Sequence, residues 1–253
     1  LLTSLMLASV LAGCNNNASN KETTAENNPV VKSTSSEVKQ TTTQEKVKKE
    51  KSSVELYNEM AKNSKSTEEI YVTGDVVVGE GKDVKPGIYD LEITGGSGNI
   101  FGTRKNLNKP FINFLAGAPD SSSHYASKIR IILFDGDVLK FTNISKIKFT
   151  AIPEEVQMSN ELGVGEYVVG RDIKPGTYKL STNKEMNPEF KNLGWDVQIV
   201  NELTKKGNNQ RFNSGNTDVV VKLEEGEIIS TMFQASRYDD LIDDARLIFT
   251  EYK

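Results

Sequence analysis

Apolar and polar residues alternate along most of the chain after about residue 70, and a period of two is typical of β-strands with one buried face. The runs 129–133 and 219–223 are the clearest, because every second residue in them is Ile, Val or Leu. Strands do not alternate with long helical segments, which argues against a doubly wound fold. The pattern predicts an all-β protein made of sandwich-like or jelly-roll-like domains.

One earlier segment has helical spacing instead. Residues 53–62 place Leu56, Met60 and Tyr57 on one face and predict a short amphipathic helix. We expect this helix to pack on the first β-domain or to fray, rather than to bind a partner.

The strand-rich region contains an internal repeat. Residues 83–91 (DVKPGIYDL) return as residues 172–180 (DIKPGTYKL). Shorter matches join 77–79 to 168–170, 129–136 to 219–226, and 147–150 to 247–250. Such self-similarity predicts two diverged copies of one domain. We place them at residues 66–153 and 160–253, called the first and second repeat, with a short connection at 152–164.

Each repeat carries the same turn motif, to which we assign a structural role. A proline followed by glycine suits the central positions of a type II turn, in which the glycine takes positive φ. An aspartate just upstream can accept backbone N–H bonds, and a tyrosine begins the outgoing strand. The residues are Asp83, Pro86, Gly87 and Tyr89 in the first repeat, and Asp172, Pro175, Gly176 and Tyr178 in the second.

Three glycine-containing segments predict further turns. Asp135-Gly136-Asp137 and Glu225-Gly226-Glu227 each lie between two apolar runs, which is typical of β-hairpins. Residues 95–102 are rich in glycine but lack the lysine and following helix of a phosphate-binding loop. We therefore expect a flexible turn there.

The first thirteen residues have no charge and are mostly Leu, Ala, Val and Met. This stretch is shorter than the roughly 20 residues of a membrane-spanning helix, and it fits the apolar part of a signal peptide. A starting Met and a charged n-region are missing, so we expect a sequence trimmed at its start. The ending Leu11-Ala12-Gly13-Cys14 resembles the lipobox of bacterial lipoproteins. That resemblance implies cleavage after residue 13 and a lipid anchor on Cys14; the alternative is an ordinary signal peptide followed by a free thiol.

Residues 15–52 are dominated by Asn, Ser, Thr, Lys, Glu and Gln and contain no aromatic residue. Such a segment buries too little apolar surface to offset its ordering entropy, so it should be disordered. Residues 14–65 would then comprise the lipidated N-terminus, a spacer that lifts the folded part from the membrane, and the short helix.

The repeated motif, Val-Gly followed by Asp-Val/Ile-Lys-Pro-Gly-x-Tyr, resembles a β-rich domain of exported proteins and lipoproteins of Gram-positive bacteria. The resemblance implies a β fold and an extracytoplasmic location, at the outer face of the bacterial cell membrane. It supplies no activity, because those proteins are largely uncharacterised.

The composition excludes several classes of site. A net charge of −4 argues against a nucleic-acid partner. One cysteine and one histidine leave too few ligands for a zinc site, and they exclude a disulfide framework. The lone His124 has no nucleophile elbow near it, so we interpret it as a solvated loop residue. We expect no catalytic, cofactor-binding or metal residues.

Three local features have a functional interpretation beside a structural one. Arg104, Lys105 and Lys109 could receive an anionic wall polymer, or could simply be solvated. The acidic insertion 235–245 could bind calcium, although a solvated helix is the default. Trp195 could stack on a sugar, although burial in the core is favoured.

The sequence thus predicts a non-enzymatic, lipid-anchored surface protein that binds a cell-wall, polysaccharide or protein partner. Two alternatives stay open: a cell-wall or glycan hydrolase that uses paired carboxylates, and a solute-binding lipoprotein of a transporter.

Overall fold

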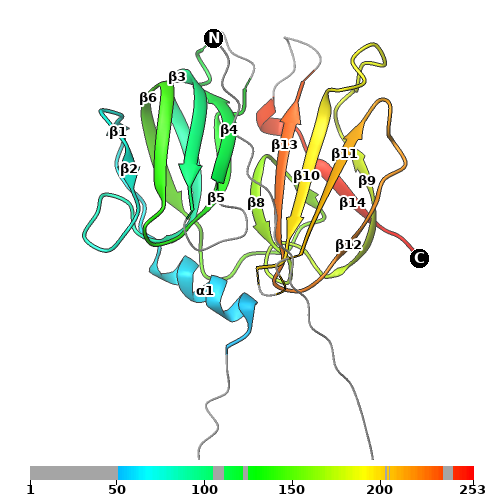
Figure 1. Ribbon diagram of the computed structural model, residues 1–253, viewed down its shortest axis with the longest axis horizontal. Helices are drawn as coiled ribbons and strands as arrows, with labels where there is room; N and C mark the ends of the chain where they lie inside the picture. Colours follow the sequence, from blue (N-terminus) through cyan, green and yellow to red (C-terminus); the bar gives the residue numbers. More distant parts are fainter. Residues whose placement is uncertain (1–50, 105–110, 122–124, 203, 205, 236–241) are drawn as a thin grey trace, which may run out of the picture. The chain divides into compact units, whose positions relative to one another are not determined.

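The computed structural model describes residues 51–104, 111–121, 125–202, 204, 206–235 and 242–253. They all belong to one compact unit, Lys49–Lys253. Within the described residues there are fourteen strands, one α-helix and one 3-10 helix, so the predicted all-β class is confirmed (Figure 1). The described part contains no helix with the length and apolarity needed to span a bilayer.

The elements follow the order of the two repeats. Helix α1 (Ser53–Asn63) comes first. The first repeat contains β1 (Ile70–Tyr71), β2 (Val76–Val77), β3 (Gly87–Thr103), β4 (Phe111–Gly117), β5 (Lys128–Leu133) and β6 (Val138–Ala151). The second contains β7 (Glu161–Leu162), β8 (Gly165–Val168), β9 (Gly176–Thr182), β10 (Gly194–Val200), β11 (Gly207–Asn213), β12 (Val220–Leu223), β13 (Ile228–Gln234), η1 (Ile242–Asp244) and β14 (Leu247–Glu251).

The strands form two sheets. The larger has the order β1-β6-β3-β5-β8-β13-β10-β11, with β2 paired to β6 and β4 paired to β3. The smaller has the order β12-β9-β14-β7. The larger sheet crosses from the first repeat to the second through the parallel neighbours β5 and β8. The division into domains at 66–153 and 160–253 therefore stays a prediction, because one sheet runs through both repeats.

In the first repeat two long strands bend together. β3 pairs with β6 along its length, and the register shifts between Ile93 and Asn99. At the bend Gly96 has φ +78°, and a Cβ on Gly98 would lie 2.0 Å from the backbone oxygen of Thr142. The glycine-rich segment is thus a bend inside a strand, and the predicted flexible turn is wrong. The two ends of β3 pair with different strands, β5 and β4, around one core.

In the second repeat the corresponding strands are interrupted. β9 and β14 belong to the smaller sheet, whereas β10 and β13 belong to the larger one. Trp195 of β10 is fully buried, and its Nε1 donates a hydrogen bond to Thr182 Oγ1 of β9 at 2.9 Å. The predicted core position of Trp195 is confirmed, and the sugar platform is excluded because the ring has no exposed surface.

The turn motif is built differently from the prediction. Neither Gly87 nor Gly176 has positive φ, so a type II turn is wrong. Each glycine instead makes room for the tyrosine two residues later: a Cβ would lie 2.8 Å from the Tyr89 ring, or 3.1 Å from the Tyr178 ring. The two phenols donate to the carbonyls four residues earlier, at 2.9 Å in both repeats.

The upstream aspartates differ between the repeats. Asp172 Oδ2 accepts a hydrogen bond from the Val168 N–H at 2.8 Å, which confirms the predicted carboxylate-to-backbone bond. Asp83 is exposed, and its side chain makes no hydrogen bond within the described residues. The segment from Gly79 to Asp83 is two residues longer than the one from Gly170 to Asp172, so Asp83 does not occupy the position that Asp172 has in the turn.

The predicted hairpins are tight turns, but their flanking strands do not pair. Gly136 and Gly226 have φ of +81° and +82°. β5 and β6 both pair with β3, and β12 and β13 lie in different sheets. Each turn is closed by the acidic residue after glycine, Asp137 or Glu227, which accepts a backbone N–H at 2.9 or 2.7 Å. Each turn therefore connects two strands that are not hydrogen-bonded to each other.

Helix α1 confirms the predicted segment but not its buried face. A capping box of Ser52 and Glu55 starts the helix. Tyr57 and Ala61 are buried, whereas Leu56 is 52% exposed. The buried face packs with residues of both repeats, not of the first alone: Ile88, Ile132, Ile152, Val168 and Ile228.

Candidate functional site at the junction of the two repeats

The two repeats meet where β5 and β8 approach closely. Arg130 is in register with Gly165, and the Arg130 N–H donates to the Val164 carbonyl at 3.2 Å. Gly165 has φ +137°, and a Cβ there would lie 2.4 Å from the Arg130 carbonyl oxygen. The junction therefore depends on a residue without a side chain.

A cluster of buried charged side chains lies beside this contact. The Arg104 guanidinium donates to both carboxylate oxygens of Glu166, at 2.7 and 2.6 Å, and to the Ile132 carbonyl. Its Nε lies 3.5 Å from Asp137 Oδ2, and the three side chains are at most 2% exposed. Burial alone would lower the pKa of Arg104, but Glu166 and Asp137 outweigh it and raise the pKa, so the arginine stays charged.

This burial corrects the interpretation of Arg104 as a solvated or polymer-binding residue. Its partner Glu166 is 62 positions away, in the other repeat. Lys105 and Lys109, grouped with it from the sequence, lie outside the described residues. The cluster therefore holds the repeats together and presents no surface to a ligand.

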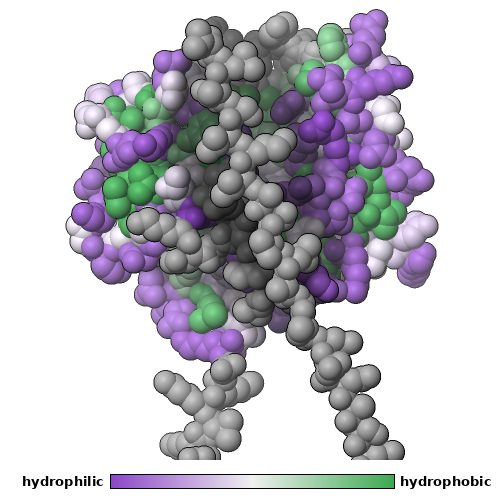
Figure 2. Space-filling model, viewed as in Figure 1, coloured by the Kyte–Doolittle hydropathy of each residue, from purple (hydrophilic) through white to green (hydrophobic). Residues whose placement is uncertain are grey.

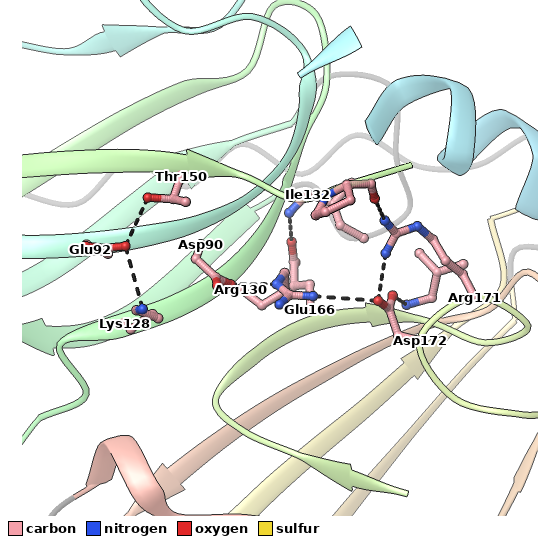
Figure 3. A network of polar contacts seen from close by, with 11 residues as sticks. Asp90, Glu92, Lys128, Arg130, Ile132, Thr150, Glu166, Arg171 and Asp172 are labelled. Carbon is pink, nitrogen blue, oxygen red and sulfur yellow. Dashed lines mark hydrogen bonds and ion pairs between the residues drawn. The ribbon is translucent and has the colours of Figure 1, made fainter. Parts of the chain in front are cut away.

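A second set of ion pairs lies at the junction, centred on Arg130 and Asp172 (Figure 3). Arg130 Nε donates to Asp90 Oδ1 at 2.6 Å, and its Nη1 lies 3.6 Å from Asp172 Oδ1. Arg171 binds the same Asp172 oxygen at 2.7 Å and the Pro153 carbonyl at 2.6 Å. Asp172 thus bonds within its own turn motif and also pairs with Arg130 of the other repeat.

A cavity of about 290 Å³, the junction cavity, opens next to these pairs. Seven charged side chains line it: Asp90, Lys128, Arg130, Glu161, Asp172, Asp243 and Arg246. Tyr167 and Ser159 add hydroxyl groups, and Leu162, Val164 and Ile242 add apolar walls. The cavity is therefore polar and small, which suits a small charged ligand more than a polymer.

A groove of similar volume, about 290 Å³, lies between β4 and the sheet face of β10, β11 and β13. Cross-strand registers place six lining residues on one face of β10, β11 and β13: Asp196, Gln198, Asn209, Arg211, Ser230 and Met232. Together with Asn113 of β4 they form what we call the amide groove. Arg211 Nε donates to Asp196 Oδ1 at 2.7 Å. On the side of the molecule drawn in Figure 2, hydrophilic residues predominate over the second repeat.

The acidic insertion is partly engaged inside the protein. Asp243 accepts hydrogen bonds from the Ser127 N–H at 2.7 Å and the Ser127 hydroxyl at 2.6 Å. Asp244 pairs with Lys184 at 2.6 Å. The other acids proposed for calcium, Asp239 and Asp240, lie outside the described residues, as do His124 and Cys14. The described part contains no group of three or more acidic, His or Cys residues able to hold a metal.

Sequence reasoning missed both the junction cavity and the amide groove. The groove had a signal, because Asp196 and Gln198 alternate with buried Trp195 and Val197 and so mark the outer face of a strand. The cavity had none, because its walls come from segments far apart in the sequence. Comparisons with protein families, with curated proteins and with solved structures gave no match to this chain.

Proposed function

We propose that this protein is a non-enzymatic surface protein, held to the outer face of a bacterial membrane by lipid on Cys14, that binds an uncharged polysaccharide of the cell envelope. The amide groove is the observation that carries the proposal. Two copies of one β-module, joined rigidly at the junction, would present the groove beyond the spacer.

The groove has the functional groups that sugars need. A side-chain amide offers both donors and an acceptor, which matches the dual character of a sugar hydroxyl. The side chains of Asn113, Gln198 and Asn209 make no hydrogen bond within the described part of the chain. They are therefore available for a ligand without breaking internal contacts.

The charge of the groove favours a neutral polymer. Its one cation, Arg211, is paired with its one anion, Asp196. A polyanion such as a phosphate-rich polymer would need several uncompensated cations, and the groove lining has none.

An exposed aromatic ring adjoins the groove. Phe101 of β3 is 49% exposed, and it is the register partner of Asn113 of β4. Directly opposed residues have Cβ atoms about 5 Å apart, so the ring lies beside the first amide. A ring in this place supplies the apolar face against which a sugar ring can pack.

The hydrolase alternative has less support. It requires two carboxylates that are free to act on a glycosidic bond. Asp90 and Asp172, two of the acids at the junction cavity, share the Arg130 guanidinium. Both are thus committed to an ion pair that stabilises the junction.

Retention of the purified chain on isolated cell walls and on immobilised neutral polysaccharide tests the proposal. Replacing Asn113, Gln198 and Asn209 together with alanine should weaken binding about 100-fold, at roughly one hydrogen bond of about 1 kcal/mol each. Asn160→Ala, an exposed amide outside the groove, is the matched control. Equal retention of the triple variant, or retention of the parent only on phosphate-bearing polymers, would refute the assignment.

The anchor is tested separately in cells. Palmitate labelling of the exported protein should depend on Cys14, and Cys14→Ala should release the chain to the medium. Labelling that persists in this variant would contradict the lipid attachment.

A further inference from the structure

Most of the charge around the junction cavity is neutralised inside the protein. Arg130 pairs with both Asp90 and Asp172. Lys128 lies 3.6 Å from Glu92, and Asp243 is bonded to Ser127. Of the seven charged lining side chains, Glu161, Asp243 and Arg246 have no oppositely charged partner in the described part of the chain. The Asp243 carboxylate is occupied by hydrogen bonds from Ser127 and from the Lys128 backbone N–H, whereas the side chain of Glu161 has none there. One cation and one anion thus stay available at the same cavity.

Arg246 is held in place while part of its guanidinium stays free. Its Nη1 donates to the carbonyls of Asp243 and Ala245, at 2.9 and 2.7 Å. Nε and Nη2 make no hydrogen bond within the described residues. A guanidinium fixed in this way keeps a pair of donors with the geometry that binds a carboxylate.

A second donor converges on the same space. Gly163 has no side chain, and the position where its Cβ would stand lies 3.4 Å from both Arg246 Nη1 and Tyr167 Oη. Burial raises the pKa of Tyr167 to about 12, with Asp90 and Asp172 adding to the rise. The phenol therefore keeps its proton and can donate beside the guanidinium.

The free anion, Glu161, lies two residues before Gly163. Glu161 belongs to β7, pairs with Ile248 of β14, and is exposed at the cavity. Gly163 follows just after the end of β7, so its Cα lies at most about 7 Å from the Cα of Glu161. A small molecule with a charge at each end fits that separation, because each hydrogen bond spans about 2.8 Å.

We propose that the junction cavity binds a small zwitterion of amino-acid or dipeptide size. Its carboxylate would lie between Arg246 and Tyr167, and its ammonium group would face Glu161. The volume of about 290 Å³ is at the lower end of small-ligand sites and leaves no room for a chain. This site is separate from the amide groove, so it stands whether or not the polysaccharide proposal holds.

Calorimetric titration of the purified full chain with three peptides tests the site. The probes are alanyl-alanine, its N-acetyl form without the ammonium group, and its C-terminal amide without the carboxylate. We expect the zwitterion to bind, and each blocked form to bind at least about tenfold more weakly, as for the loss of one charged hydrogen-bond partner. No binding of the zwitterion up to roughly 10 mM, or equal binding of all three, would overturn the proposal.

Conservative variants assign the two charges. Glu161→Gln should remove the preference for the free ammonium over the N-acetyl form, and Arg246→Gln the preference for the free acid over the amide. Tyr167→Phe removes the hydroxyl oxygen but keeps the ring, and it should weaken binding of the zwitterion about tenfold. This variant decides the test if Arg246→Gln fails to fold.

Arg211→Gln, in the amide groove, is the matched control and should leave dipeptide binding unchanged. Dipeptide binding that is insensitive to both Glu161→Gln and Tyr167→Phe would show that the ligand lies elsewhere. Loss of polysaccharide retention in the groove variants, with dipeptide binding intact, would separate the two sites.

Discussion

The two repeats bury the same aromatic pair but reach it along different paths. Tyr89 packs edge-on against Phe149 with ring centroids 5.7 Å apart, and Tyr178 packs against Phe249 at 5.9 Å. In the first repeat continuous strands β3 and β6 bend around this core. In the second repeat each of these strands is replaced by two shorter ones: β9 and β10 correspond to β3, and β13 and β14 correspond to β6.

The cross-strand registers show which residues of the continuous strand β3 correspond to residues of the shorter strand β10. Val138 pairs with Thr103 in the first repeat, and Ile228 pairs with Val200 in the second, so Thr103 corresponds to Val200. Five residues earlier, position 98 (103 − 5) corresponds to position 195 (200 − 5). The first repeat has glycine there, in contact with the opposite backbone, and the second has its largest core residue, Trp195.

A continuous strand must therefore give up a side chain at the bend, whereas an interrupted strand can bury one. The interruption also creates segments between the strands, and one of them, between β13 and β14, supplies Asp243 and Arg246 to the junction cavity. The second repeat thus supplies Glu161, Tyr167 and Arg246, the groups of the junction cavity that are proposed to bind a ligand. The location of Arg246 between two strands agrees with the tendency of connecting segments to carry function.

The largest effect should come from Arg104, the buried cation that the first repeat contributes to the junction. Arg104→Met leaves Glu166 and Asp137 without their counter-charge in a dry site, so the free energy of unfolding should fall by about 3–5 kcal/mol in urea denaturation. Arg211→Gln removes the exposed pair with Asp196 and should cost under about 1 kcal/mol. Adding Glu166→Met to Arg104→Met should recover part of the loss.

A loss of less than about 1 kcal/mol for Arg104→Met would mean that water reaches the cluster. The junction would then depend on apolar packing under α1 alone.

The bend in β3 should give the next largest effect. Gly98→Ala places a Cβ 2.0 Å from the Thr142 carbonyl oxygen, which the backbone must move to accommodate. We expect a loss of on the order of 3 kcal/mol in the same measurement. Gly74→Ala, where no atom lies within 4 Å, should change stability by less than about 0.5 kcal/mol. Similar values for the two variants would show that the first repeat is not constrained by its bend.

Much of this fold follows from local sequence signals. The period of two around Ile129 and Val221 predicted buried strand faces, and both residues are buried. Gly136 and Gly226 predicted tight turns, and both have positive φ. Local signals failed where the outcome depends on a distant partner. The glycine-rich stretch of β3 resembles a loop until it is seen against the strand opposite, β6.

The sites depend on distant partners even more. Arg104 is charged and follows a strand, so its sequence context predicts exposure, and only Glu166 of the other repeat reveals its burial. Arg246 and Glu161 belong to opposite ends of the second repeat and meet through the pairing of β7 with β14. Neither residue propensity nor periodicity predicts that these two residues line one cavity, because their proximity arises only when the sheet is assembled.

The turn motif gives the finest comparison, because its residues are nearly identical in the two repeats. At Gly87 a Cβ would lie 2.3 Å from Ser64 Oγ and 2.8 Å from the Tyr89 ring, whereas at Gly176 the nearest contact is the Tyr178 ring at 3.1 Å. Gly87→Ala should therefore cost about 2 kcal/mol, and Gly176→Ala about 1 kcal/mol or less, by urea denaturation. Ser64→Ala in the Gly87→Ala background should narrow the gap, since it removes the closest atom. An equal loss of stability in both repeats would mean that glycine is required only because of the tyrosine ring. Ser64, which follows α1, would then make no contribution to that requirement.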